Sequence, residues 1–209
     1  MIILDCVQGE KEWMEARRAI PTSSCFSKII TASGNLSGQW DKYLATLCAE
    51  YIDPEHSVAN RVYTKAMKQG NEREPAARKL YEDVAGYKVR EVGGLYLDDS
   101  KSAMCSPDGL IESIKTGWET KCPNLDTHWL YLSKNKVPDQ YVIQVQSGMA
   151  FAKYEKWVFM SYHPKYKPLI IDVDADRALI KKIQQSVAYF NTELTAAKAE
   201  IDSYNLVEF

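Results

Sequence analysis

The chain has 209 residues, of which 45% are hydrophobic, and its formal net charge at pH 7 is −2. This composition is typical of a globular protein and excludes a disordered chain, and no run of about 18 apolar residues predicts a membrane span. The five cysteines are widely spaced and form no Cys-x-x-Cys pair. We therefore expect no disulfide framework and a cytoplasmic location.

Two further classes of feature are not expected. The first residues lack the basic segment of a signal peptide, and the three histidines lie too far apart for a structural zinc site. The charge decides neither for nor against a nucleic-acid partner, because a locally basic surface can hold one while acidic residues lower the total.

The N-terminal part, about residues 1–86, is predicted to be helical. Apolar spacing predicts helices at 10–18, 40–51, 58–68 and 72–84, with the last two separated at Gly70. Pro75 then falls in the first turn of the last of these helices. The cluster Thr22, Ser23 and Ser24 predicts the N-cap of a further helix that buries Phe26, Ile29 and Ile30.

The middle of the chain, about residues 87–175, changes period. Segments rich in β-branched and aromatic residues predict successive antiparallel strands at 87–97, 103–112 and 117–122, and two more strands at 156–162 and 169–173. Helices are expected at 127–133 and 139–152, and an amphipathic C-terminal helix from 175 to about 204. The fold class is therefore α+β, one domain over 1–209 with a central mixed sheet flanked by helices.

The segments SPDGL (106–110) and WETKCP (118–123) carry the chemistry. A hairpin turn near Ser113–Thr116, closed by Gly117, places Glu112 opposite Lys115 and hence Asp108 opposite Glu119. Glu119 and Lys121 share one face because strand side chains alternate, while the Thr120 carbonyl is left near the acids.

Two opposed carboxylates repel each other, and burial increases the cost. Mg²⁺ removes this cost, because two carboxylates and a carbonyl are the hard oxygen ligands it prefers. Lys121 is then placed to activate a water or to stabilise a phosphate, as hydrolysis of a phosphodiester requires. The alternative is a surface hairpin with an ordinary salt bridge, since the pattern is short and Asp99-Ser100-Lys101 repeats part of it in a solvated turn.

Several short motifs follow one another along the chain: Trp13-x₃-Arg17 with Thr22-Ser23-Ser24, Gly70-x₃-Glu74, the Asp108 and Glu119-Thr120-Lys121 hairpin, Gln144-x-Gln146, and residues 157–164. Their order resembles the phage lambda exonuclease family, also called YqaJ-type viral recombinases, within the PD-(D/E)xK nucleases. They cover most of residues 13–165. The chain departs from the family's pattern where T-A-S becomes T-S-S and at Asn71, neither of which is an expected ligand.

The resemblance implies a restriction-endonuclease-like fold and roles for single residues. Asp108, Glu119 and the Thr120 carbonyl are implied to bind metal, with Glu74 helping to hold a second ion and Lys121 as the catalytic lysine. Gln146 is implied to orient the water or Lys121, whereas Gln144 is left as structural. Arg17 and Ser24 are implied to bind the terminal 5′-phosphate of the digested strand.

The resulting hypothesis is a 5′→3′ exonuclease using Mg²⁺, with two ions and Mn²⁺ as a substitute. It acts on double-stranded DNA ends and leaves 3′ single-stranded overhangs for phage-type recombination. The resemblance also implies a homotrimeric ring, a single-strand annealing protein as partner, and a bacterial host cell as location. The alternatives are a related endonuclease, a RecB-like nuclease of opposite polarity, and a non-catalytic scaffold that binds DNA ends around a structural ion.

Overall fold

The computed structural model describes residues 1–55 and 65–205, and its centre is a mixed four-stranded sheet. The strands are β4 (Gly109–Ile111), β5 (Thr116–Lys121), β6 (Lys156–Ser161) and β7 (Leu169–Asp174), in that spatial order. β5 and β6 are parallel, while the two outer pairs are antiparallel. A parallel pair needs a crossover, which is formed by α5 (Leu125–Lys134) and α6 (Asp139–Ala152). The mixed sheet and the 139–152 helix confirm the prediction.

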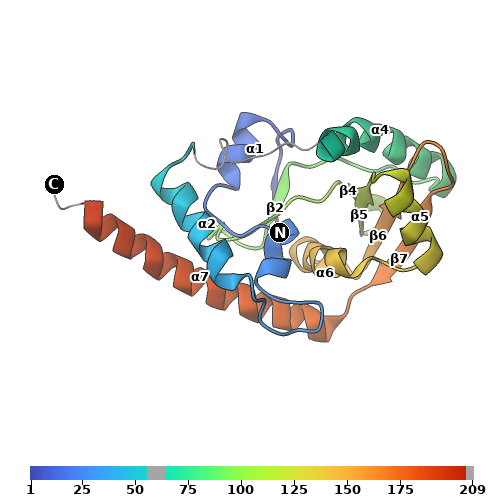
Figure 1. The fold of residues 1–209 in the computed structure, drawn as a ribbon. Helices are drawn as coiled ribbons and strands as arrows, with labels where there is room; N and C mark the ends of the chain where they lie inside the picture. Colours follow the sequence, from blue (N-terminus) through green and yellow to red (C-terminus); the bar gives the residue numbers. More distant parts are fainter. Residues whose placement is uncertain (56–64, 206–209) are drawn as a thin grey trace.

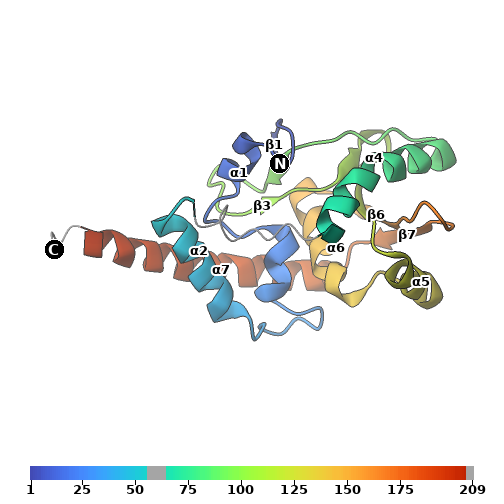
Figure 2. The same ribbon diagram turned by 45° about the horizontal axis from the view of Figure 1, so that its top comes forward.

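The two faces of this sheet pack against different helices. Trp157 and Phe159 belong to the larger core on the α6 side, with α7 (Arg177–Asn205) behind it. Their neighbours Val158 and Met160 join Trp118 in a second core, with Ala77 and Tyr81 of α4 (Lys65–Ala85). Figures 1 and 2 show α4 and α6 on opposite sides of the strands. The alternation of strand side chains thus places β5 between two apolar layers.

A second, three-stranded sheet corrects the predicted strand at 103–112. That segment divides into β3 (Met104–Cys105) and β4, which belong to different sheets. Between them lies Pro107, which has no amide hydrogen for a ladder hydrogen bond. β3 pairs with β2 (Gly94–Tyr96), and β2 pairs with β1 (Ile2–Leu4), a strand that was not predicted.

Two of the N-terminal helices lie where predicted, and a third differs from the prediction in type. α1 (Lys11–Ala16) and α2 (Trp40–Ile52) lie where expected, but the segment after Thr22 is η1, a 3₁₀ helix at Ser23–Lys28. Thr22 makes no side-chain cap hydrogen bond. The short 3₁₀ form still buries Phe26, Ile29 and Ile30 as predicted.

α4 corrects the prediction of a break at Gly70. The helix runs through Gly70, and Pro75 lies in its interior rather than in its first turn. The part of the predicted 58–68 helix before Lys65 falls outside the described residues. The hairpin turn is also shifted, because Glu112–Ile114 forms a 3₁₀ turn that ends at Lys115 with φ of 49°. Thr116 and Gly117 are therefore strand residues of β5.

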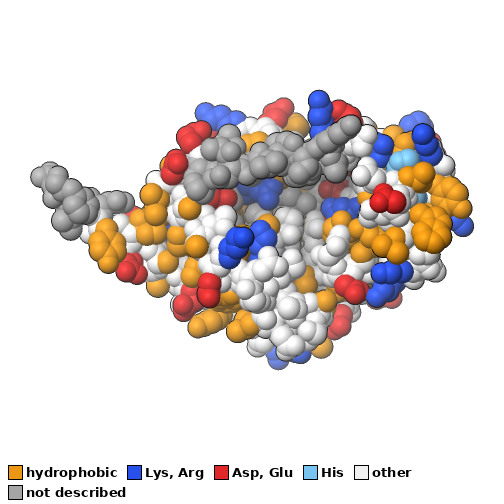
Figure 3. Space-filling model, in the orientation of Figure 1, with side chains coloured by type: hydrophobic (Ala, Val, Ile, Leu, Met, Phe, Trp, Pro, Cys, Tyr) orange, Lys and Arg blue, Asp and Glu red, His pale blue; other side chains and the backbone are white. Residues whose placement is uncertain are grey.

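The surface carries charges of both signs. On the face shown in Figure 3, the Lys and Arg side chains are scattered among Asp and Glu and do not form one continuous basic area. Exposed apolar side chains on α5 include Leu125, Trp129 and Leu130. Within the described part of the chain, no helix combines the length and apolarity that crossing a membrane requires.

Candidate active site

The β4–β5 hairpin brings Asp108 and Glu119 side by side. Gly109 pairs with Trp118, so the residues one step further along each strand are Asp108 and Glu119. This confirms the register expected from the sequence. Asp108 Oδ2 accepts a hydrogen bond of 2.7 Å from the backbone N–H of Thr120. The acid is therefore fixed against β5 by the main chain of the residue that follows Glu119.

Glu119 and Lys121 form a buried ion pair on the face of β5 toward α6. Lys121 Nζ lies 2.5 Å from Glu119 Oε1, and the Glu119 residue is only 2% exposed, while a quarter of the Lys121 side chain is exposed. The side-chain amide of Gln144, on α6, donates a second hydrogen bond of 2.6 Å to the same oxygen. Two donors thus fix the orientation of the Glu119 carboxylate.

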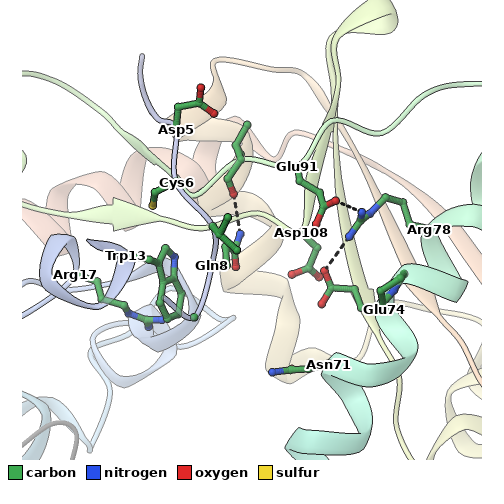
Figure 4. Close-up of a pocket in the computed structure, with 14 residues that line it drawn as sticks. Asp5, Cys6, Gln8, Trp13, Arg17, Asn71, Glu74, Arg78, Glu91 and Asp108 are labelled. Carbon is green, nitrogen blue, oxygen red and sulfur yellow. Dashed lines mark hydrogen bonds and ion pairs between the residues drawn. The ribbon is translucent and has the colours of Figure 1, made fainter. Parts of the chain in front are cut away.

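Glu74 approaches this pair from α4. In Figure 4 its carboxyl group and that of Asp108 point toward each other. Arg78, one turn further along α4, lies 3.6 Å from Glu74 and is also paired with Glu91. One arginine therefore offsets part of the negative charge on the α4 side, as Lys121 does on the β5 side.

Burial and mutual repulsion make these acids hard to ionise. Burial, and after it the charge of Asp108, raises the pKa of Glu119 to about 8. The same two causes raise the pKa of Glu74 to about 7. Burial also raises the pKa of Asp108, although Lys121 and the Thr120 N–H oppose the shift. Burial lowers the pKa of the Lys121 ammonium, but Glu119 and Asp108 outweigh it and the net shift is upward. The cluster is thus short of positive charge.

The donor chemistry of this cluster fits a hard divalent cation. Carboxylate oxygens and a main-chain carbonyl are the ligands that Mg²⁺ accepts, and a cation would relieve the repulsion that raises the acids' pKa values. Over residues 1–55 and 65–205, no three His, Cys, Asp or Glu side chains converge tightly enough to form a metal site by themselves. An ion here would be held by Asp108 and Glu119 with the Thr120 carbonyl, and Glu74 would contribute from α4.

Arg17 and Ser24 come together at the start of η1. The Arg17 guanidinium stacks over the Trp13 ring at 4.1 Å from its centroid, and Nη2 lies 3.4 Å from Thr22 Oγ1. The hydroxyls of Thr22 and Ser24 are 3.5 Å apart. Trp13 Nε1 in turn donates to Gly93 O at 2.9 Å and to a serine hydroxyl in the segment before Asp108, Ser106 Oγ, at 3.1 Å. The stacked guanidinium therefore has a fixed position relative to Asp108.

One cavity of about 940 Å³ is lined by members of both groups, whereas Ser24, Glu119 and Lys121 do not line it. Trp13 and Arg17 line one part of it, and Glu74, Arg78 and Asp108 line another (Figure 4). Its volume lies within the roughly 300–1,000 Å³ of ordinary ligand pockets. A chain of nucleotides in this cavity could contact the arginine and the acids together.

The N-terminal segment closes one side of the cavity. Gln8 Nε2 donates hydrogen bonds to Val92 O at 2.9 Å and to Pro107 O at 2.8 Å. This side chain ties the loop before α1 to the residue that precedes Asp108. This role could not be predicted from the sequence, because a single glutamine before α1 belongs to no recognisable motif.

The structure does not bring the Gln146 side chain to the acids. Its Nε2 donates to Asp174 O at 3.0 Å and its Oε1 accepts from Asp176 N at 2.9 Å. Both ends of the amide are thus engaged at the start of α7. Residues two apart in a helix point about 200° apart, so when Gln146 faces α7, Gln144 faces β5. Gln144, which was interpreted as structural, is the residue that reaches Glu119.

Comparison with known proteins is consistent with this site. Residues 12–155, more than half of the chain, match the YqaJ-like viral recombinase domain. The chain belongs to the YqaJ-like viral recombinase family. The match spans all the residues assigned to the site above except the first few that line the cavity, and it confirms the family inferred from the ordered motifs. Among curated protein sequences, none is similar enough to count as a match.

Solved structures support the same fold. The alkaline exonuclease LHK-Exo from Laribacter hongkongensis is 27% identical with a TM-score of 0.82, over 94% of this chain and 98% of that one. Its complex with dAMP gives the same identity and TM-score, over 95% and 100% of the two chains. A phage-related exonuclease from Haemophilus somnus 129PT, 16% identical with a TM-score of 0.66 over 90% and 99%, shares the fold. The PD-(D/E)xK-like fold class is thereby confirmed.

Proposed function

We propose that this protein is a Mg²⁺-dependent 5′→3′ exonuclease that digests one strand from the ends of double-stranded DNA. The observation that carries the proposal is the joining of two sites by one cavity. Asp108, beside Glu119 and Lys121, lies at one part of it, and Arg17 lies at the other. The similarity to a protein described as an alkaline exonuclease supports the reaction class.

Each residue of the site has its own proposed role. Asp108, Glu119 and the Thr120 carbonyl would hold one Mg²⁺, and Glu74 would help to hold a second. Bound Mg²⁺ supplies Lewis acidity and compensates the charge of the phosphodiester. Lys121 orients the attacking water or stabilises negative charge on the phosphate. Gln144 keeps the Glu119 carboxylate in a single orientation through its side-chain amide.

The other end of the cavity selects the end of the DNA strand. The Arg17 guanidinium presents a planar pair of donors suited to phosphate oxygens, and stacking on Trp13 keeps that plane fixed. The Thr22 hydroxyl lies 3.4 Å from Nη2 of Arg17, and the Ser24 hydroxyl, 3.5 Å from that of Thr22, adds a further donor. A terminal 5′-phosphate bound here places a phosphodiester further along the same strand at the acids. Digestion from the 5′ end follows from this order of contacts.

The test is incubation with linear duplex DNA that carries labels at either end, with and without Mg²⁺. We expect Mg²⁺-dependent release of 5′-mononucleotides from the 5′-labelled end first, leaving 3′ overhangs, with Mn²⁺ able to replace Mg²⁺. Release of the 3′ label first would favour a RecB-like polarity. Cleavage of closed circles would favour an endonuclease, and binding of ends without any release would favour a scaffold. Lys121→Ala should abolish release without unfolding the protein.

The remaining parts of the proposal concern assembly and setting. We infer a homotrimeric ring that surrounds the duplex, a single-strand annealing protein as partner, and action in the cytoplasm of a bacterial host of a phage or prophage. Membership in the YqaJ-like viral recombinase family supports these proposals. Sedimentation of the purified protein tests the trimer, and co-purification with an annealing protein tests the partner.

A further inference from the structure

The ammonium of Lys121 has two neighbours of different chemistry. Glu119 Oε1 lies 2.5 Å from Nζ, and the ring of Tyr141, on α6, lies beneath Nζ with its centroid 5.3 Å away. A cation within about 6 Å of an aromatic face is attracted by the ring's quadrupole. The lysine is therefore held by a carboxylate and by an aromatic face together.

The ring of Tyr141 is fixed by its own packing. It stacks on Phe159 with centroids 5.5 Å apart and an interplanar angle of 29°, and it meets Tyr131 edge-on at 6.3 Å and 89°. Phe159 is fully buried and is the partner of Glu119 in the β5–β6 register. The strand neighbour of Glu119 thus sets the position of the surface on which Lys121 rests.

Tyr141 and Gln144 extend from the same side of α6. They are three residues apart, a spacing that places helical side chains on one face. Gln144 contacts Glu119, and Tyr141 contacts Lys121. One face of α6 therefore contacts both members of the buried ion pair, each through a different side chain.

We propose that Tyr141 is a positioning residue that keeps Lys121 in place when Glu119 binds the metal ion. This inference rests on the proposed function. Glu119 Oε1 holds the ammonium, but a carboxylate that ligates a divalent cation would give up much of its attraction for a second cation. The neutral ring is not a ligand for hard cations, so its hold on Lys121 persists.

The first test varies the ring electronically. Tyr141 is replaced by Phe, by Phe with one, two and three ring fluorines, and by Leu. Fluorine withdraws electron density from the ring face and weakens cation–π attraction while size and packing change little. Phe should keep near-normal kcat, each fluorine should lower it, and Leu should lower it about tenfold, a value between those of an exposed and a desolvated cation–π contact. KM for DNA and the thermal midpoint of the fluorinated proteins should stay constant. Equal kcat across the fluorinated series would overturn the proposal.

The second test does not depend on cleavage. In metal-free protein labelled with [ε-¹³C]lysine, the Lys121 methylene signal, assigned from Lys121→Arg, should be shifted upfield by the ring in the normal and Tyr141→Phe proteins. It should return to the ordinary lysine position in Tyr141→Leu. An ordinary shift in the normal protein would overturn the contact itself. A protein that cleaves no DNA but shows the shifted signal would contradict the proposed function and leave the contact standing.

Discussion

Gln144 and Lys121 donate to the same oxygen of Glu119, at 2.6 Å and 2.5 Å. A carboxylate whose oxygen accepts from two donors, one of them charged, is fixed in direction. The pair of donors comes from two elements, β5 and α6. The geometry of the acid therefore depends on the packing of this helix against the sheet.

Replacing Gln144 by Ala should lower kcat by about 10- to 100-fold, because a hydrogen bond to a charged group contributes roughly 1.5–3 kcal/mol. The matched control is Gln146→Ala, two residues away on the same helix. That change removes two hydrogen bonds to the main chain at Asp174 and Asp176. It should lower the free energy of unfolding by roughly 1–3 kcal/mol and leave kcat of the folded protein unchanged. If Gln146→Ala instead lowers kcat and Gln144→Ala lowers only the free energy of unfolding, Gln146 has the role in the site that the sequence predicts for it.

The contrast between these two glutamines shows where sequence patterns are sufficient. The register of Asp108 against Glu119 follows from the hairpin, and the shared face of Glu119 and Lys121 follows from the period of a strand. The rotation of α6 about its axis was not fixed by its pattern, because Val142, Val145 and Met149 leave both glutamines near the boundary of the apolar face. Gln144 faces β5 because Gln146 forms hydrogen bonds with the main chain at Asp174 and Asp176, where α7 begins.

Other features depend on contacts between distant segments. The split between β3 and β4 follows from pairing with β1 and β2, which the local sequence around Pro107 does not specify. Likewise, no local pattern connects Arg17 to Asp108. Their common cavity arises from hydrogen bonds such as those of Trp13 to Gly93 and Ser106. Motif order in the family suggested that these residues belong to one site, but it did not supply the geometry.

The raised pKa values of the buried acids predict an unusual dependence of the free energy of unfolding on pH when metal is removed. The folded-state pKa values of Glu119 and Glu74, about 8 and about 7, lie above their ordinary value of 4.5. Between pH 4.5 and about pH 8 the folded protein binds more protons than the unfolded chain. The free energy of unfolding therefore falls as the pH rises through this range. In EDTA, the thermal midpoint should therefore decline from pH 5 to pH 8.5, and saturating Mg²⁺ should reduce the decline.

The control for this prediction is Asp108→Asn. The amide keeps an acceptor for the Thr120 N–H but removes the charge that raises both glutamate pKa values. The variant should show a shallower decline, a higher midpoint at pH 8 in EDTA, and no cleavage. His163, whose pKa is lowered chiefly by burial, has the opposite effect on the slope, but it is present in both proteins and cancels in the comparison. Parallel curves for the two proteins would exclude a coupled acid cluster.

Two glycines provide a test of the packing beneath the site. A Cβ on Gly117, two residues before Glu119, would lie 2.1 Å from a ring atom of Trp157, which is fully enclosed. Gly117→Ala should lower the free energy of unfolding by roughly 1–3 kcal/mol through overpacking. Gly70 in α4 has open space around the same atom, and Gly70→Ala should raise it by about 0.5–1 kcal/mol because alanine favours a helix. Urea unfolding of both variants measures the difference, and similar midpoints would contradict the packing of β5 against β6.

Arg17 is expected to act on the end of the DNA strand and not on the chemical step. Its guanidinium is held by Trp13 and lies beside Thr22, in the same cavity as Asp108. Arg17→Ala should slow digestion of 5′-phosphorylated duplex by about 10- to 100-fold, the value of a charge-assisted hydrogen bond of roughly 1.5–3 kcal/mol. On 5′-hydroxyl ends the loss should be small, because the phosphate that Arg17 binds is missing.

Two variants separate this role from charge alone. Arg17→Lys keeps the charge but loses the planar fork and its stacking on Trp13, so we expect it to recover only part of the rate on phosphorylated ends. Lys28→Ala removes one positive charge from η1, where the ammonium lies 5.2 Å from the Tyr43 ring centroid and does not line the cavity. It should digest both kinds of end at the normal ratio. If Arg17→Ala slows both ends equally, the residue contributes general DNA affinity, and the 5′-phosphate must be bound elsewhere in the cavity.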